Sequence, residues 1–150
     1  MTRTAVVTGA SAGIGEAFAH ELARDGFDVV LVARRREKLE AVKAAIEPEH
    51  RVKAYVLPED LSDLAAPQRI FDALARDGLH IDMLVNNAGA GIAELFKDAT
   101  WAQHAQLIQV HVTASAHLTH LLLPAMIERG YGRIIQVASL AGLMPGSPTS

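Results

Sequence analysis

The chain has 150 residues, of which 50% are hydrophobic and 21% are charged, with a formal net charge of −3 and no cysteine. The length suits one globular domain with a real core, and the composition excludes a disordered or fibrous chain. The charge provides no basic field for nucleic acid, and the lack of cysteine excludes disulfides and thiolate chemistry. We expect a cytoplasmic protein with no membrane partner, because the first apolar run is very short and Pro124 breaks the longest one.

Short apolar runs alternate with helical patterns along the chain. The runs predict strands over 5–8, 28–33, 52–57, 82–86 and 133–138, and three of them are almost continuously apolar, as strands covered on both faces are. Helices are predicted over 13–25, 36–47, 64–77 and 100–129, with His111 as a candidate division point in the last. Strands that alternate with helices form βαβ units with right-handed crossovers. The predicted fold is therefore α/β, a doubly wound parallel sheet of the Rossmann type in a single domain.

The first strand leads directly into a glycine-rich turn and then into a helix. Gly9 allows the chain to turn sharply, Gly13 removes a Cβ that would block a pyrophosphate, and Gly15 lets the helix pack close to the sheet. Phosphates would lie at the N-terminus of that helix, where unpaired N–H groups and the helix dipole favour an anion. A flexible turn without a ligand is the alternative interpretation, since glycine-rich turns by themselves are weak evidence.

The end of the second predicted strand indicates which dinucleotide is bound. An acidic residue there holds the ribose 2′-hydroxyl of NAD, whereas an arginine accommodates the 2′-phosphate of NADP. Here Ala33 stands where the acid would be and Arg34 follows it. This favours NADP over NAD. The alternative is a solvated basic turn offset by Glu37 and Glu40.

Four motifs occur in one order along the chain: Thr8 to Gly15, Asp60-Leu61, Asn86-Asn-Ala-Gly89 and Ala138-Ser139-Leu-Ala-Gly142. Together they resemble the classical short-chain dehydrogenase/reductase family, and the resemblance runs from Thr4 to about Gly146. It implies hydride transfer between a nicotinamide coenzyme and a small carbonyl or alcohol substrate. It also implies that 1–150 is a dinucleotide-binding domain incomplete at its C-terminus, and that the full-length form is a homo-oligomer.

The resemblance assigns roles to individual positions. Ser139 is the serine that hydrogen-bonds the substrate oxygen while the coenzyme supplies the hydride. Asn86 is expected to link the central strands. The coenzyme-binding residues implied by the family are Gly9, Ser11, Gly13, Ile14 and Gly15 for the phosphates, Arg34 for the 2′-phosphate, Asp60 and Leu61 for the adenine, and Asn87, Ala88 and Gly89 for the ribose side.

Two features depart from the family pattern. The family requires a tyrosine acid/base about a dozen residues after the serine and a lysine four residues later, but the sequence at hand ends at Ser150. Tyr55 and Tyr131 cannot substitute, because Glu59 and Ile135 stand four residues after them. His111 replaces the usual asparagine of the long helix. It either joins the proton relay as a catalytic residue, since histidine titrates near neutral pH, or is a tolerated substitution.

Three hypotheses of function remain open at this stage. The chain is part of an NADP-dependent reductase or dehydrogenase, a non-catalytic dinucleotide-binding module, or a relative of the isomerase or epimerase type. No metal site is expected, because His117 and His120 lack a third ligand. Ile134, Ile135 and Val137 are expected to lie on an open apolar edge, which would make residues 1–150 prone to aggregate.

Overall fold

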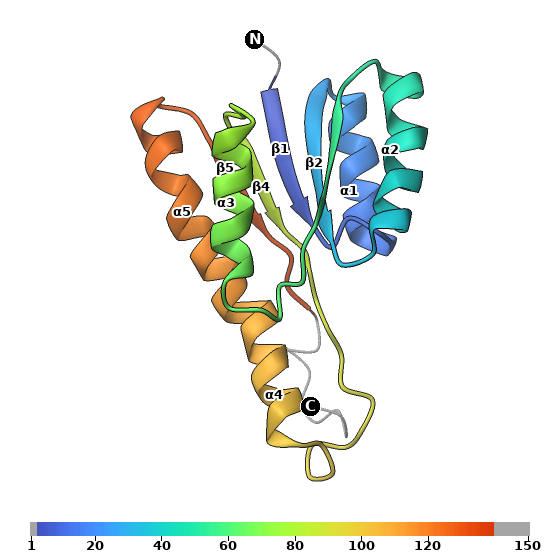
Figure 1. Cartoon of the computed structure of the whole chain (residues 1–150), viewed down its shortest axis with the longest axis vertical. Helices are drawn as coiled ribbons and strands as arrows, with labels where there is room; N and C mark the ends of the chain where they lie inside the picture. Colours follow the sequence, from blue (N-terminus) through green and yellow to red (C-terminus); the bar gives the residue numbers. More distant parts are fainter. Residues whose placement is uncertain (1–2, 140–150) are drawn as a thin grey trace.

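A computed structural model describes residues 3–139 as a parallel sheet with helices on both faces (Figure 1). The strand order is β3-β2-β1-β4-β5, and every neighbouring pair is parallel. The strands are β1 (Arg3–Thr8), β2 (Phe27–Ala33), β3 (Ala54–Pro58), β4 (Met83–Asn86) and β5 (Arg133–Gln136). The predicted doubly wound α/β fold is confirmed.

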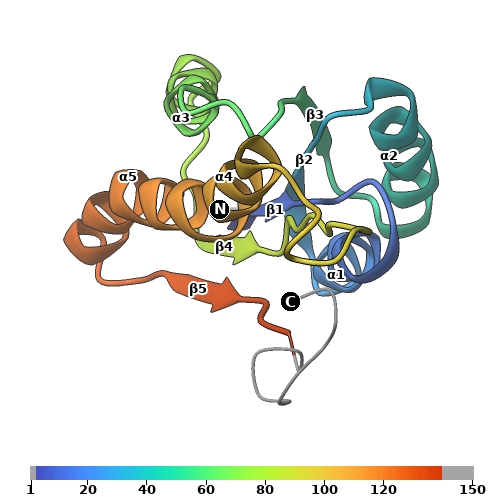
Figure 2. The ribbon, with the colours of Figure 1, turned by 90° about the horizontal axis from the view of Figure 1, so that it is seen from below.

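Two hydrophobic clusters fill the space on either side of the sheet. Because side chains alternate along a strand, Ala5 and Val7 of β1 point to one face and Val6 points to the other. Helices α1 (Gly13–Arg24) and α2 (Arg36–His50) cover the first face, and α3 (Ala66–Arg76) and α5 (Ala114–Glu128) cover the second (Figure 2). The central strands are therefore buried on both sides, as their apolar runs indicate.

The order of the strands creates a crevice at one edge of the sheet. The chain builds β1, β2 and β3 in one direction and then crosses β1 to place β4 on its other side. The connections after β1 and β4 therefore lead to helices on opposite faces of the sheet. Ligands of doubly wound sheets bind at this topological switch point, and Gly9, Asp60, Asn87 and Ser139 of the four sequence motifs lie at this edge.

The last predicted helix is continuous over Trp101–Glu128 but changes its winding near His111. It consists of α4 (Trp101–Ile108), a π-helical segment η1 (Gln109–Thr113) and α5. Thr100 begins it with a capping box, in which the Thr100 hydroxyl accepts from the Gln103 N–H and the Gln103 side chain accepts from the Thr100 N–H. The candidate division at His111 thus corresponds to a π-turn, which single inserted residues produce at functional sites.

The expectation that Pro124 interrupts the longest apolar stretch is wrong, because Pro124 lies inside α5. The helix over Trp101–Glu128 is long and apolar enough to cross a bilayer by length and composition alone. A core helix passes the same test, and Leu118 and Leu122 of α5 are buried against the sheet.

One other boundary and one surface differ from the sequence prediction. α2 continues past Pro48 to His50, because the Arg51 N–H donates to the Glu47 carbonyl oxygen and closes the final turn. β5 forms an edge of the sheet within residues 3–139, as expected. Its apolar side chains, however, are not fully exposed to solvent. Ile134 packs into one cluster and Ile135 and Val137 into the other, so all three are partly buried.

Candidate functional site

The turn after β1 is specified by three glycines with different surroundings. Gly9 has a φ of +69°, and a Cβ there would lie 2.8 Å from Nδ2 of Asn87 and 2.9 Å from Cα of Ala88. A Cβ on Gly15 would overlap the carbonyl group of Gly9, which shows how closely α1 approaches the turn. Gly13 has a φ of +60°, yet a Cβ there would meet nothing within 4 Å. Gly13 therefore faces open space, as a position that a ligand approaches must.

The N-terminus of α1 has N–H groups without side-chain partners in the described part of the chain. Its N-cap is Ala12, which has no side chain that can cap. Ile14 in the first turn is 62% exposed, and Ser11 in the preceding turn is half-buried. An anion at this end would satisfy donors that otherwise require water.

A cleft of about 130 Å³ lies against this turn. Residues from the loops after four different strands line it, and six of them were singled out from the sequence. These six are Gly9, Ser11, Arg34, Asp60, Leu61 and Ala88. The fold thus brings together motifs from the turn after β1, the end of β2, the end of β3 and the loop after β4.

Arg34 lies at the rim of this cleft, in a bend directly after β2. Its side chain is exposed and has no hydrogen bond or ion pair with any residue in the range 3–139. The alternative interpretation named Glu37 and Glu40 as the acids that offset the basic turn. Glu40 pairs with Arg36 at 3.5 Å, and neither acid pairs with Arg34 within residues 3–139. The Arg34 guanidinium therefore keeps its donors available for a ligand, within the part of the chain described.

The loop after β3 is held by local hydrogen bonds and ion pairs and by one bond from Gln109. Asp60 Oδ1 accepts from the Ser62 N–H at 3.0 Å, and the Leu61 carbonyl accepts from the Gln109 side chain at 3.3 Å. Arg69 of α3 donates to both carboxylate oxygens of Glu59 and to Asp63. The Ala65 N–H, followed by Arg69, lowers the pKa of Asp63, and the two carboxylates raise the pKa of Arg69. One carboxylate oxygen of Asp60 therefore accepts a hydrogen bond within its own turn.

Thr8 organises the loop after β4, and sequence reasoning gave it no role of its own. Its buried hydroxyl donates to the Val85 carbonyl and accepts from the N–H groups of Asn87 and Ala88 at 2.9 and 3.0 Å. The Asn87 side chain donates back to the Thr8 carbonyl at 3.0 Å. A threonine directly before Gly9, at the end of a buried strand, was the one feature of the sequence that could have indicated this role. The sequence could not show its partners, because they are 77 to 80 residues away.

The link between the central strands is therefore made by Thr8 and Asn87 rather than by Asn86. The Asn86 side chain donates to the Ser115 carbonyl at 3.3 Å and to the Thr119 hydroxyl at 3.2 Å, both on α5. Its Oδ1 is buried without a hydrogen-bond partner among the described residues. Asn86 ties β4 to the helix above it.

His111 lies at the centre of the π-turn and contacts the loop after β4. Its Nε2 lies 2.8 Å from the Ala90 carbonyl oxygen and 3.0 Å from the Ala90 nitrogen. A Cβ on Gly89 would lie 3.1 Å from the His111 ring, so the glycine permits this approach. The structure thus places His111 beside the loop after β4, and its ring serves to position Ala90, which lines the cleft.

Ser139 follows β5 at the same edge of the sheet as Gly9 and Ala88. The two tyrosines in the chain lie elsewhere. Tyr55 is in β3, the strand at the opposite side of the sheet, and Tyr131 precedes β5, at the other end of that strand. Gly142, the last residue of the Ser139 motif, is outside the described residues.

The sequence matches the short chain dehydrogenase family over residues 3–150. The chain is 39% identical over 145 residues to very-long-chain 3-oxoacyl-CoA reductase-B of Danio rerio, covering 94% of this chain and 46% of that protein. A metagenomic short-chain oxidoreductase solved with NADP is 40% identical with a TM-score of 0.89, covering 98% of this chain and 66% of the other. L-sorbose reductase of Gluconobacter frateurii, solved with NADPH and L-sorbose, is 30% identical with a TM-score of 0.92, covering 99% and 56%.

This chain spans about half the length of the curated relatives it matches. The match nevertheless covers every described strand and helix, and it includes the glycine turn and the cleft beside it. The chain belongs to the short-chain dehydrogenase family of oxidoreductases.

Proposed function

We propose that this chain supplies the coenzyme-binding part of an NADP(H)-dependent oxidoreductase, which transfers hydride between the nicotinamide and a small carbonyl or alcohol substrate. The observation that carries the choice of NADP is Arg34, an exposed cation without a partner in residues 3–139 at the rim of the cleft. Two similar structures hold NADPH or NADP, which supports the proposal. The similar proteins named as reductases support the reaction class. A cytoplasmic location and a homo-oligomeric full-length protein belong to the same proposal.

The residues of this chain would act by binding and orientation. The N–H groups at the start of α1 would hold the pyrophosphate, and Arg34 would pair with the 2′-phosphate. The bound coenzyme supplies the hydride. Ser139 would hydrogen-bond the substrate oxygen as its charge changes during the transfer. The tyrosine and lysine that the family uses would come from sequence outside residues 1–150.

Replacing Arg34 tests the choice of coenzyme. In the complete natural chain that contains this sequence, Arg34→Ala should weaken NADPH binding by about ten- to a hundredfold, because a charged hydrogen bond is worth about 1.5–3 kcal/mol. Binding of NADH should change little. Calorimetric titration with each coenzyme measures this, and Arg36→Ala is the matched control because Arg36 pairs with Glu40. Tighter binding of NADH than of NADPH by the unaltered protein would refute the proposal.

Replacing Gly13 tests the phosphate cradle separately from the fold. Gly13 and Gly26 both have a positive φ and open space around the position of a Cβ, so alanine should cost each about the same stability. Only Gly13 lies at the N-terminus of α1. Gly13→Ala should therefore weaken binding of both coenzymes by more than about tenfold, and Gly26→Ala should not. Equal coenzyme affinity in the two variants would place the cradle elsewhere.

A further inference from the structure

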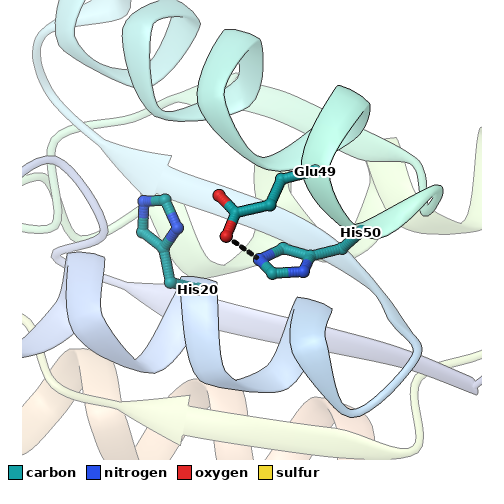
Figure 3. Close-up of side chains that lie close together, drawn as sticks. All are labelled: His20, Glu49 and His50. Carbon is teal, nitrogen blue, oxygen red and sulfur yellow. Dashed lines mark ion pairs between the residues drawn. The ribbon is translucent and has the colours of Figure 1, made fainter.

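Three potential metal ligands meet on the surface formed by α1 and α2, far from the cleft. They are His20 on α1 and Glu49 and His50 in the last turn of α2 (Figure 3). One donor atom from each lies within 4.8 Å of the other two. Among residues 3–139, no other group of three or more histidine, aspartate or glutamate side chains comes this close.

The arrangement depends on the end of α2 that the sequence did not predict. If the helix ended before Pro48, Glu49 and His50 would lie in a loop. Instead the helix continues to His50, and Arg51 ends it in the left-handed conformation with a φ of +58°. This additional turn brings both side chains beside the middle of α1, and Figure 3 shows the Glu49 carboxylate reaching between the two imidazole rings.

The three side chains have few competing interactions. His50 Nε2 and Glu49 Oε1 are 3.8 Å apart, which is too far for a hydrogen bond. The rings of His20 and His50 are 6.4 Å apart at an interplanar angle of 79°, so they meet edge to face rather than stacked. No hydrogen bond of any of the three is found within the described part of the chain, so their donor atoms are available to an ion.

Small side-chain movements would complete a coordination sphere. Zinc binds histidine nitrogen and carboxylate oxygen at about 2.0–2.2 Å, so ligand atoms of a tetrahedral site lie about 3.4 Å apart. The widest separation here must shorten by roughly 1 to 1.5 Å to reach that value. His50 has a side chain only 12% exposed and is held in place, whereas the Glu49 side chain is 65% exposed and can rotate.

We propose that His20, Glu49 and His50 form a site for a divalent transition-metal ion, with Zn²⁺ as the best fit. Two imidazoles and one carboxylate are a ligand set that zinc accepts, with a fourth position left for water. The ion would tie the last turn of α2 to α1. Its role is structural, because His20 lies about 10 Å along α1 from Gly13 and His50 is at the opposite end of α2 from Arg36. This proposal differs from the expectation from sequence that the chain has no metal site.

Calorimetric titration of the complete natural chain with ZnCl₂ tests the site. The protein is untagged, stripped of metal with a chelator and held at about pH 7.5, where imidazole is neutral and can ligate. We expect one Zn²⁺ per site and a higher Tm with the ion present. His20→Asn and His50→Asn should each weaken binding by at least about tenfold, and lowering the pH to about 5.5 should weaken it as well.

Three further variants keep the result decisive. Glu49→Gln changes an exposed side chain, so the fold is retained even if a histidine variant is unstable, and Zn²⁺ binding should still weaken. His80→Asn and His117→Asn remove histidines outside the site and should leave the affinity unchanged. Absence of saturable Zn²⁺ binding, or binding that is unaltered in both His20→Asn and Glu49→Gln, would overturn the proposal. None of these measurements depends on coenzyme binding or on activity.

Discussion

The loops after β1, β2 and β3 form one group, and the loop after β4 forms a second group that is built differently. In the first group, the main features come from residues close together in sequence: the glycines of the first turn, Arg34 beside β2, and Glu59 with Arg69 ten residues later. In the second group, distant residues hold the loop. Thr8 binds Asn87 and Ala88, and His111 binds Ala90.

The two groups of loops form different sides of the cleft. The first group offers groups that can bind a ligand directly, namely the N–H groups of α1 and the Arg34 guanidinium. The second group forms the wall opposite to them, and its position depends on tertiary contacts. Gly9 is where the two groups touch, since Asn87 and Ala88 leave no room for a side chain there. Substitutions at the contact should therefore affect the fold most, and those in local ion pairs least.

The largest effect is expected for Gly9→Ala. The new Cβ would lie within 3 Å of Asn87 and of the Ala88 backbone, and the left-handed φ adds a further cost. We expect the free energy of unfolding to fall by about 3–4 kcal/mol, the sum of backbone strain and overpacking. Urea denaturation of the complete natural chain measures it. Gly26→Ala has the same strain without the overlap and should cost only about 1–2 kcal/mol. If both variants lost equal stability, the two groups of loops would not be in close contact at Gly9.

An intermediate effect is expected for Thr8→Val, which conserves shape but removes the hydroxyl. The N–H groups of Asn87 and Ala88 would lose their acceptor, at a cost of about 1–3 kcal/mol each if buried, so we expect about 3 kcal/mol in total. Thermal and urea unfolding measure the loss, and hydrogen exchange should show faster exchange at these two amides.

Thr119→Val is the matched control on the β5 side. Its hydroxyl accepts from the side chains of Asn86 and Gln136, but Asn86 keeps its bond to Ser115 and Gln136 is exposed. We expect a loss of about 1 kcal/mol. A greater loss for Thr119→Val than for Thr8→Val would show that α5, rather than β1, fixes the loop after β4.

Most of the fold and the first group of loops could be predicted from the sequence, because their signals are local. The apolar runs identified all five strands, and positive φ together with close packing explains why glycine occupies the first turn. Arg34 was also identifiable, because the residue type and its place at the strand end carry the chemistry.

The remainder depends on contacts between distant parts of the chain. The bonds of Thr8 to the loop after β4 span 77 to 80 residues, and no spacing rule within one segment indicates them. The family resemblance implied that Asn86 links the central strands, yet α5 lies above it and its side chain donates to the Ser115 carbonyl of that helix. His20 and His50 come together only because α2 continues past Pro48, where a proline normally argues for a helix end.

The smallest effect is expected for Asp63→Asn, in the local ion cluster after β3. The pKa of Asp63 is lowered from 3.8, so its carboxylate contributes stability above that value, and the contribution is lost as the pH falls through the lower pKa of the folded state. Asparagine cannot titrate, so the fall in Tm from about pH 6 to about pH 3 should be smaller in the variant than in the unaltered chain.

Because both partners of the Asp63–Arg69 ion pair are about half exposed, the Tm near neutral pH should change by no more than about 2 °C, and less at high salt. Differential scanning calorimetry over this range measures both quantities, with Asp72→Asn as the control, since among residues 3–139 the Asp72 carboxylate accepts only from the uncharged side chain of Gln68. A Tm difference that salt leaves unchanged would show that Asp63 acts through its hydrogen bond to the Ala65 N–H rather than through its ion pair with Arg69.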